Sequence, residues 1–203
     1  MLHNVTKMLL DNILNSGNKL KLLRELSLHE NWNYNINELA KNTDIHRVRI
    51  SSLIKELADS GVIKIINKGK VKLISINKEN YFVKNILIDL FDKENNLALH
   101  IAQKIADEIK KEKGIVSIIL FGSAIKNKFT FKSDLDLMII INKEIDAKYI
   151  ENIIKKYSNG ILISYDIINI AIFKKLFKEK EASIVSLIKD NKTLYGKDVL
   201  EVI

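Results

Sequence analysis

The sequence predicts an α+β protein of two domains, because its hydrophobic pattern changes along the chain. Through about residue 60, apolar residues recur at helical spacing. Val62–Ile66 and Val71–Ile76 then have the pattern of two short strands with a turn between them. Beyond Asn95, helical and strand-like segments alternate, which predicts a small mixed sheet flanked by helices. We place the boundary within Asp92–Asn96 and expect domains at residues 1–92 and 93–203.

The composition excludes several classes of protein. None of the 203 residues is cysteine, which rules out disulfides, thiolate zinc sites, iron–sulfur clusters and cysteine nucleophiles. No apolar stretch approaches the ~18 residues of a membrane-spanning helix, and Asn4, Lys7 and Asp11 interrupt any signal peptide. We therefore expect a cytoplasmic protein without a membrane partner. The net charge of +8 favours polyanionic partners such as nucleic acid or nucleotide phosphates.

The first domain is expected to contain helices followed by a hairpin and one more helix. Asn35 with Glu38 resembles a capping box and predicts the start of a helix. Gly17 and Gly61 are expected to stop the helices before them. The predicted elements are helices Val5–Leu14, Leu20–Leu28, Asn35–Lys41 and His46–Ser60, strands Val62–Ile66 and Val71–Ile76, and helix Tyr81–Phe91.

The second domain is expected to alternate helices and strands. The predicted elements are helix Asn95–Lys111, strands Val116–Phe121 and Leu135–Ile141, helix Ala147–Tyr157, a third strand within Ile161–Phe173, helix Ala182–Lys189, and a short tail that includes Leu194–Gly196.

A helix, a tight turn, a second helix and a hairpin form the outline of a winged helix-turn-helix. The hairpin carries four lysines, and no acidic residue occurs between Ser60 and Lys78, which suits the phosphates of DNA. Residues 36–66 resemble winged-helix transcription regulators, with Asp44 in the turn where many of those proteins have glycine. A solvated hairpin and a protein-docking module are the alternatives. The residues expected to contact DNA are His46, Arg47, Arg49, Ser52, Lys68 and Lys70.

A second group of residues points to nucleotide chemistry. Gly122 and Ser123 end one strand-like segment, and Asp134 and Asp136 begin the next. Residues i and i+2 of a strand project to the same face, so the two carboxylates would repel each other unless a cation lay between them. Ligands that are all oxygen favour Mg²⁺ or Mn²⁺ over zinc. Glycine followed by serine would let a phosphate approach the backbone.

Gly122-Ser123 followed by Asp134-x-Asp136 resembles the signature of the nucleotidyltransferase superfamily that includes DNA polymerase β, and most closely its minimal members. The resemblance covers about residues 95–203. It implies transfer of an NMP, such as AMP from ATP, to an acceptor hydroxyl. It also implies that Gly122, Ser123 and Lys126 bind the nucleotide, whereas many minimal members have arginine where Lys126 stands.

The superfamily pattern includes a third carboxylate on a later strand. Asp166 is our candidate, because a charged residue within the apolar segment Ile163–Ile168 calls for a partner or a metal ion. With Asp134 and Asp136 it would form the catalytic and metal-binding set. Glu144 and Asp146 are alternatives in a loop, where acidic residues need no explanation.

The expected partners are a nucleotide with Mg²⁺ or Mn²⁺, and double-stranded DNA through the winged helix. Because some minimal nucleotidyltransferases are paired with toxin proteins, a toxin-like protein acceptor is also compatible, and a homodimer is left open. The alternative function is a DNA-binding transcriptional regulator whose nucleotidyltransferase domain senses nucleotide or is catalytically inert. Intact Asp134, Asp136 and Asp166 favour the enzyme, whereas Lys126 and Asn127 leave room for the regulator.

Overall fold

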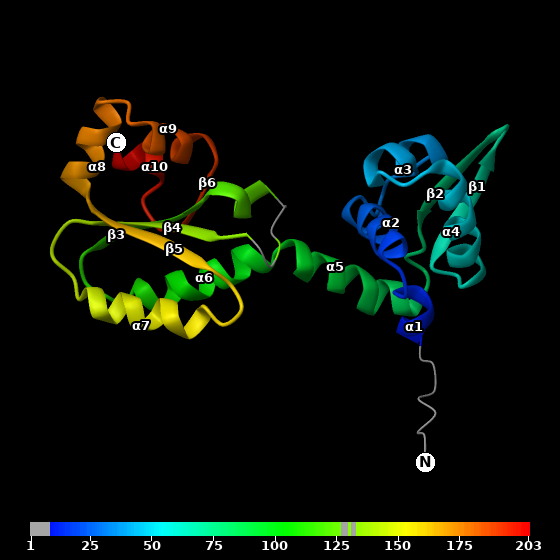
Figure 1. The fold of residues 1–203 in the computed structure, drawn as a ribbon, viewed down its shortest axis with the longest axis horizontal. Coiled ribbons are helices and arrows are strands. Elements are labelled where there is room, and N and C mark those ends of the chain that lie inside the picture. Colours follow the sequence, from blue (N-terminus) through cyan, green and yellow to red (C-terminus); the bar gives the residue numbers. More distant parts are fainter. Residues whose placement is uncertain (1–8, 127–129, 131–132) are drawn as a thin grey trace, which may run out of the picture. The chain divides into compact units, whose positions relative to one another are not determined.

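The computed structural model describes residues 9–126, 130 and 133–203, without the side chains of Leu9 and Lys126. Contacts between residues divide the chain into two compact units, Met1–Glu94 and Asn95–Ile203 (Figure 1). In the part of the chain that the structure describes, no helix is long and apolar enough to cross a membrane.

Unit 1 consists of helices and a two-stranded hairpin, in the order that the sequence predicts. β1 and β2 are antiparallel, with Ile63 opposite Ile76 and Lys68 opposite Val71. The elements are α1 (Leu9–Ile13), α2 (Gly17–Leu28), α3 (Ile36–Thr43), α4 (Arg47–Asp59), β1 (Ile63–Lys68), β2 (Val71–Ile76), the π-helical turn η1 (Val83–Leu87) and α5 (Ile88–Asn95).

Local hydrogen bonds explain where these helices begin and end. The side chain of Asn35 accepts from the backbone N–H of Glu38, whose side chain accepts from the Asn35 N–H, so the predicted capping box is confirmed. Asp44 follows α3 with a φ of 53°, a left-handed conformation that aspartate tolerates better than most residues. The prediction for Gly17 is wrong. Ser16 caps the start of α2, and Gly17 is the first residue of that helix.

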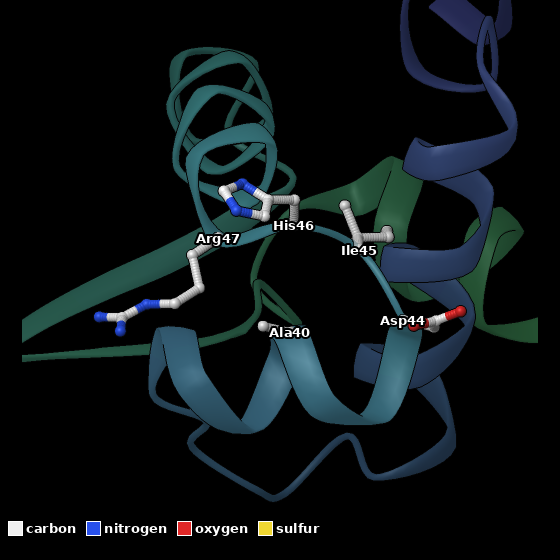
Figure 2. A pocket seen from close by; sticks show the side chains of 5 residues that line it. All are labelled: Ala40, Asp44, Ile45, His46 and Arg47. Carbon is white, nitrogen blue, oxygen red and sulfur yellow. The ribbon is translucent and has the colours of Figure 1, made fainter.

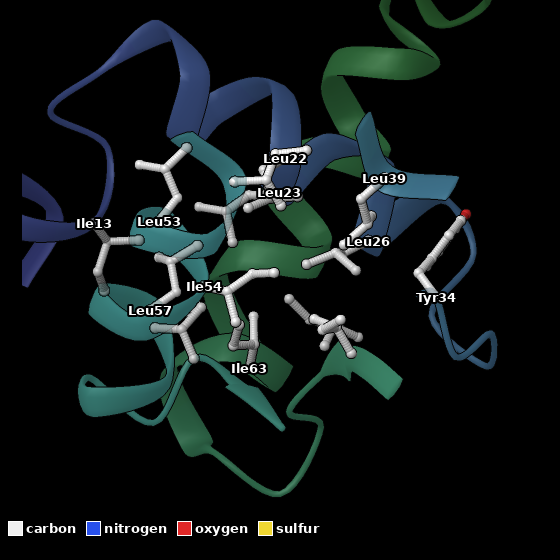
Figure 3. Packing of buried hydrophobic residues seen from close by; sticks show 14 of the residues in the cluster. Ile13, Leu22, Leu23, Leu26, Tyr34, Leu39, Leu53, Ile54, Leu57 and Ile63 are labelled. Atoms are coloured by element: carbon white, nitrogen blue, oxygen red, sulfur yellow. The ribbon is translucent and has the colours of Figure 1, made fainter. Parts of the chain in front are cut away.

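One apolar core holds the helices of unit 1 on the hairpin. Leu22 and Leu23 of α2 and Leu53 and Leu57 of α4 are at most 1% exposed and belong to the cluster drawn in Figure 3. Gly61 has a φ of 69° and turns the chain from α4 toward β1, as predicted. Because α4 and the hairpin share this core, their exposed faces keep a fixed relation to each other.

Unit 2 is a four-stranded mixed sheet between two layers of helices. Its elements are α6 (Leu97–Ile109), β3 (Ile115–Phe121), the 3₁₀ turn η2 (Gly122–Lys126), β4 (Leu135–Ile141), α7 (Ala147–Tyr157), β5 (Ile163–Asn169), α8 (Ile170–Lys178), α9 (Ala182–Lys189), β6 (Asn191–Gly196) and α10 (Val199–Val202). The strand order is β5-β4-β3-β6, with β4 and β5 parallel and the other pairs antiparallel. Helices α6 and α7 cover one face, and α8, α9 and α10 cover the other (Figure 1).

The elements of unit 2 that the sequence did not predict include α8 and β6. The segment Ile161–Phe173 was expected to contain a strand, and it also contains the start of α8. The predicted tail is in part the strand β6, whose first residues Asn191, Lys192 and Thr193 are polar and give no strand signal. β6 pairs with β3 so that Asn191 stands opposite Phe121, at the edge of η2.

Candidate active site

The chain turns sharply where β3 ends. Gly122 has a φ of 77°, a conformation that residues with side chains rarely adopt. A Cβ atom at this position would lie 2.5 Å from Oδ2 of Asp136. Phe121 pairs with Asp136 across β3 and β4, which brings the carboxylate to the turn. Both the backbone and the neighbouring side chain therefore require glycine at this position.

Asp134 and Asp136 stand at the start of β4 and are both half-buried. Asp136 pairs with Phe121, which packs in the cluster beneath α8, α9 and α10. Leu135 and Leu137 pack in the cluster on the opposite face, as the alternation of a strand predicts. The strand thus separates its carboxylates from its leucines.

Electrostatic repulsion within this group acts on Asp136. Burial raises the pKa of the Asp136 carboxyl above its usual range, and the negative charges of Asp134 and Asp166 raise that pKa further. In the described chain, no lysine or arginine forms an ion pair with any of these three residues. Three like charges with no counter-charge among the described residues favour the binding of a cation.

Asp166 lies in β5, the edge strand parallel to β4. It pairs with Met138, two residues beyond Asp136, and therefore projects from the same face as Asp136. Its side chain is exposed. The predicted reason for its role, a charge buried within an apolar strand, is therefore wrong. Asp166 remains a candidate for the third carboxylate because it lies on the strand next to β4 and on the same face as Asp136. Its burial does not support that role.

The two alternative carboxylates lie elsewhere. The side chain of Asp146 accepts hydrogen bonds from the backbone N–H groups of Lys148 and Tyr149 and thereby caps α7. Glu144 is exposed in the loop between β4 and α7. Both follow the end of β4, whereas Asp136 is near its start, and a strand advances about 3.3 Å per residue. Neither residue joins the carboxylate group.

The donor atoms suit a hard divalent cation. Among the residues that the structure describes, no three His, Asp or Glu side chains form a group that could hold a metal ion. The donor chemistry of Asp134, Asp136 and Asp166 nevertheless matches Mg²⁺ or Mn²⁺, because each offers carboxylate oxygens only and no described lysine or arginine forms an ion pair with them. The missing side chain of Gly122 leaves open the space beside Oδ2 of Asp136.

The predicted nucleotide-binding residues follow β3 directly. Ser123 is exposed and lies in η2, a 3₁₀ turn of five residues. This turn is too short to supply a helix N-terminus for a phosphate. The side chain of Lys126, the third predicted residue, lies outside the described part of the chain.

One protein family matches the segment that contains these residues. Residues 103–199 match the protein family described as polymerase beta, nucleotidyltransferase. The matched segment is just under half of the chain and contains Gly122, Asp134, Asp136 and Asp166. Residues 103–199 are a nucleotidyltransferase domain.

Solved structures share low similarity with the chain. A protein from Sulfolobus solfataricus described as a nucleotidyltransferase is 14% identical with a TM-score of 0.34, and the match covers 52% of this chain and 86% of that one. Spectinomycin adenyltransferase AAD(9) from Enterococcus faecialis, solved with ATP and spectinomycin, is 18% identical with a TM-score of 0.36, and the match covers 52% and 58%. TrmBL2, an archaeal chromatin protein, is 16% identical with a TM-score of 0.29, and the match covers 89% and 75%. No curated protein matches the chain.

Outside the nucleotidyltransferase domain, the predicted DNA-contacting residues gather on α4 and the hairpin. His46, Arg47 and Arg49 are exposed at the start of α4, and the His46 side chain makes no capping hydrogen bond there. Figure 2 shows a pocket of about 440 Å³ beside them, with the Arg47 guanidinium at one side and Asp44 at the other.

The remaining residues of that surface differ in what they contact. Lys68 and Lys70 are exposed at the end of the hairpin. The Ser52 hydroxyl donates to the carboxylate of Glu56 on the same helix. Val48 also belongs to this surface and is 72% exposed, but the sequence analysis did not include it. In the sequence, only its position between Arg47 and Arg49 indicates that it lies there.

Proposed function

We propose that the nucleotidyltransferase domain transfers a nucleoside monophosphate, AMP from ATP, to an acceptor hydroxyl with release of pyrophosphate. The observation that carries this proposal is the position of Asp136, which is half-buried, close to two other carboxylates and directly against Gly122. Burying one carboxylate among others disfavours folding. The arrangement is useful where a cation and phosphates bind.

The carboxylates and the glycine turn would bind different parts of the metal–nucleotide complex. Asp134 and Asp136 would hold the metal ion, since both stand at the start of β4 beside the turn. Gly122 gives phosphate oxygens access to the backbone, and the exposed hydroxyl of Ser123 can donate to them. When bound, Mg²⁺ neutralises phosphate charge and polarises the phosphorus that is attacked.

The exposed position of Asp166 suits a role on the acceptor side. The acceptor oxygen forms a bond to the α-phosphorus, and the bond from that phosphorus to the bridging oxygen of the β-phosphate breaks. The hydroxyl proton passes to a carboxylate, a role that we assign to Asp166, and pyrophosphate leaves with its bonding electron pair. An acceptor arriving from solvent can reach an exposed carboxylate on an edge strand.

The direct test is incorporation of label. The full chain is incubated with each α-labelled NTP, Mg²⁺ and a host lysate as the source of acceptors. A labelled product that fails to form with γ-labelled NTP or with EDTA supports the proposal. Asp136→Asn should abolish the product, and Glu144→Gln, which removes an exposed carboxylate outside the group, should not. No product with any NTP would contradict transfer and favour the DNA-binding regulator with an inert domain.

A second proposed function is DNA binding by unit 1 as a winged helix. The supporting observation is that exposed basic side chains lie on α4 and on the hairpin, two elements that share one core. The start of α4 would enter the major groove, where Arg49 can reach a base edge, and Lys68 and Lys70 would contact phosphates. If the chain shows no salt-dependent affinity for duplex DNA, unit 1 is better interpreted as a docking module for a protein acceptor such as a toxin-like partner.

A further inference from the structure

Unit 2 contains a pocket of about 160 Å³ that the proposed reaction does not use. The pocket lies between the junction of α5 with α6, the end of β3, the turn η2 and β6. Its lining includes Asn95, Leu99, Leu120, Ala124, Ile125 and Lys192.

The pocket and the carboxylates lie on opposite faces of the sheet. Leu120, which lines the pocket, packs in the cluster beneath α6 and α7. Its neighbour Phe121, which pairs with Asp136, packs beneath α8, α9 and α10. Successive residues of a strand project to opposite faces. A ligand in the pocket would therefore not compete for the space beside Asp136.

The walls of the pocket are apolar. Leu120 and Ala124 are 1% and 7% exposed, and Leu99 and Ile125 pack partly buried against the same cluster. None of these side chains can form a hydrogen bond. The volume is close to that of an apolar cavity of about 150 Å³ that takes up benzene. An apolar body the size of a single ring therefore fits.

Two polar groups without described partners stand at the rim. Lys192 is exposed, and no described carboxylate forms an ion pair with its ammonium group. It pairs with Leu120 across β6 and β3, so both residues belong to the same face. The side-chain amide of Asn95 likewise makes no hydrogen bond to a described residue. Lys192 is charged and none of the described lining residues is acidic, so the charge of the described lining is positive.

We infer that this pocket binds a small organic anion, namely a carboxylate on a single ring or on a branched aliphatic body of similar size. The body rests against Leu99, Leu120 and Ile125. The carboxylate accepts hydrogen bonds from Nζ of Lys192 and from the amide of Asn95. Ala124 and Ile125 follow Ser123 within η2, so the ligand contacts the same turn that meets Asp136 on its other side.

The test uses the full chain with benzoate as the probe and benzyl alcohol as its neutral analogue, titrated by NMR. We expect benzoate to bind and Lys192→Gln to weaken its affinity roughly three- to fivefold, the range for losing one exposed ion pair. Benzyl alcohol should bind that variant as it binds the native chain. Lys189→Gln removes an exposed lysine that does not line the pocket and serves as the matched control.

Two further variants fill the pocket from different walls. Ala124→Leu and Leu99→Trp should each abolish binding of both probes, and a melting curve identifies either variant that fails to fold. The inference is overturned if the native chain does not bind benzoate, if benzoate persists in a folded filled variant, or if Lys192→Gln binds it unchanged. Adenosine binding that is tighter than benzoate binding, and that a folded Ala124→Leu variant abolishes, overturns the assignment of an anion to the pocket. Binding does not depend on transfer, so failure of the transfer assay leaves this inference standing.

Discussion

The two charged surfaces of this protein are built in different ways. In unit 2, three carboxylates project from one face of a sheet, and the half-buried Asp136 lies directly beside Gly122. In unit 1, basic side chains extend into solvent from a helix start and a hairpin, and the predicted ones are all exposed. A site for chemistry depends on exact placement of a few atoms, whereas a surface for a polyanion depends on the number of accessible charges. A single substitution should therefore abolish most of the activity at the carboxylate site, whereas each substitution on the basic surface should weaken binding only in part.

The largest expected effect is on the transfer rate, and it distinguishes the role of Asp166 from that of Asp136. Asp166→Asn should reduce transfer by about 10²–10⁴-fold, the range for loss of a general base, while the Kd for Mg-ATP changes by less than about twofold. Asp136→Asn should instead weaken Mg-ATP binding, because it removes a charge from the proposed metal site. Calorimetry and a single-turnover assay measure the two quantities. If Asp166→Asn weakens nucleotide binding as much as Asp136→Asn does, the assignment of Asp166 to the acceptor side is wrong.

Two glycines test how far the site depends on placement. Gly122 and Gly160 have φ values of 77° and 82°, but a Cβ would meet Asp136 at the first and nothing within 4 Å at the second. Each alanine variant should lose about 1–2 kcal/mol of stability from left-handed strain. Only Gly122→Ala should also lose about 10²-fold in transfer, since it displaces the carboxylate. Equal activity of the two variants would remove Gly122 from the site.

Single substitutions on the basic surface of unit 1 should each weaken DNA binding only in part. Lys68→Ala should weaken binding to every duplex and reduce the slope of log affinity against log salt by about one, as expected for one lost phosphate contact. Arg49→Ala should flatten the preference among sequences if Arg49 contacts a base edge. Lys84→Ala, at an exposed lysine of η1, is the control. Fluorescence anisotropy at several salt concentrations decides, and an unchanged slope for Lys68→Ala would exclude that contact.

The smallest expected effect concerns stability in the absence of metal. Asp136→Asn should raise the melting temperature in EDTA by about 1–3 °C, because it removes a half-buried charge beside two like charges. A raised pKa means that ionisation of Asp136 lowers stability as the pH rises above the ordinary aspartate range. The gain should be present at neutral pH and fade as the pH falls toward that range. A lower melting temperature for the variant at neutral pH would show that the carboxylate makes a stabilising contact.

The sequence predicted elements well where local chemistry decides the structure. β4 and α7 have the predicted bounds, and the Asn35 capping box forms as expected, because alternation, periodicity and caps are local signals. The pairing of Asp136 with Phe121 follows from two strands that each carry such a signal.

The features that the sequence did not predict depend on tertiary contacts between distant segments. β6 exists because β3 offers it hydrogen bonds, and its own polar start gives no sign of a strand. Asp166 was chosen for burial, but β5 is an edge strand and leaves it exposed. Neither the strand order nor the position of an edge can be derived from one segment alone. The apolar pocket could not be predicted either, since Leu99, Ala124 and Lys192 come from three separate elements.

The pairing of β3 with β6 has a consequence for the order of assembly during translation. Phe121, at the end of β3, pairs with Asn191, seventy positions later in the chain. Contacts so distant in sequence form late, because a long loop must close before they stabilise anything. A ribosome that has released the chain only through β5 has supplied all three carboxylates but not the strand that borders the glycine turn. A nascent chain is therefore expected to remain inactive, whichever acceptor it later modifies, until its last strand has joined the sheet.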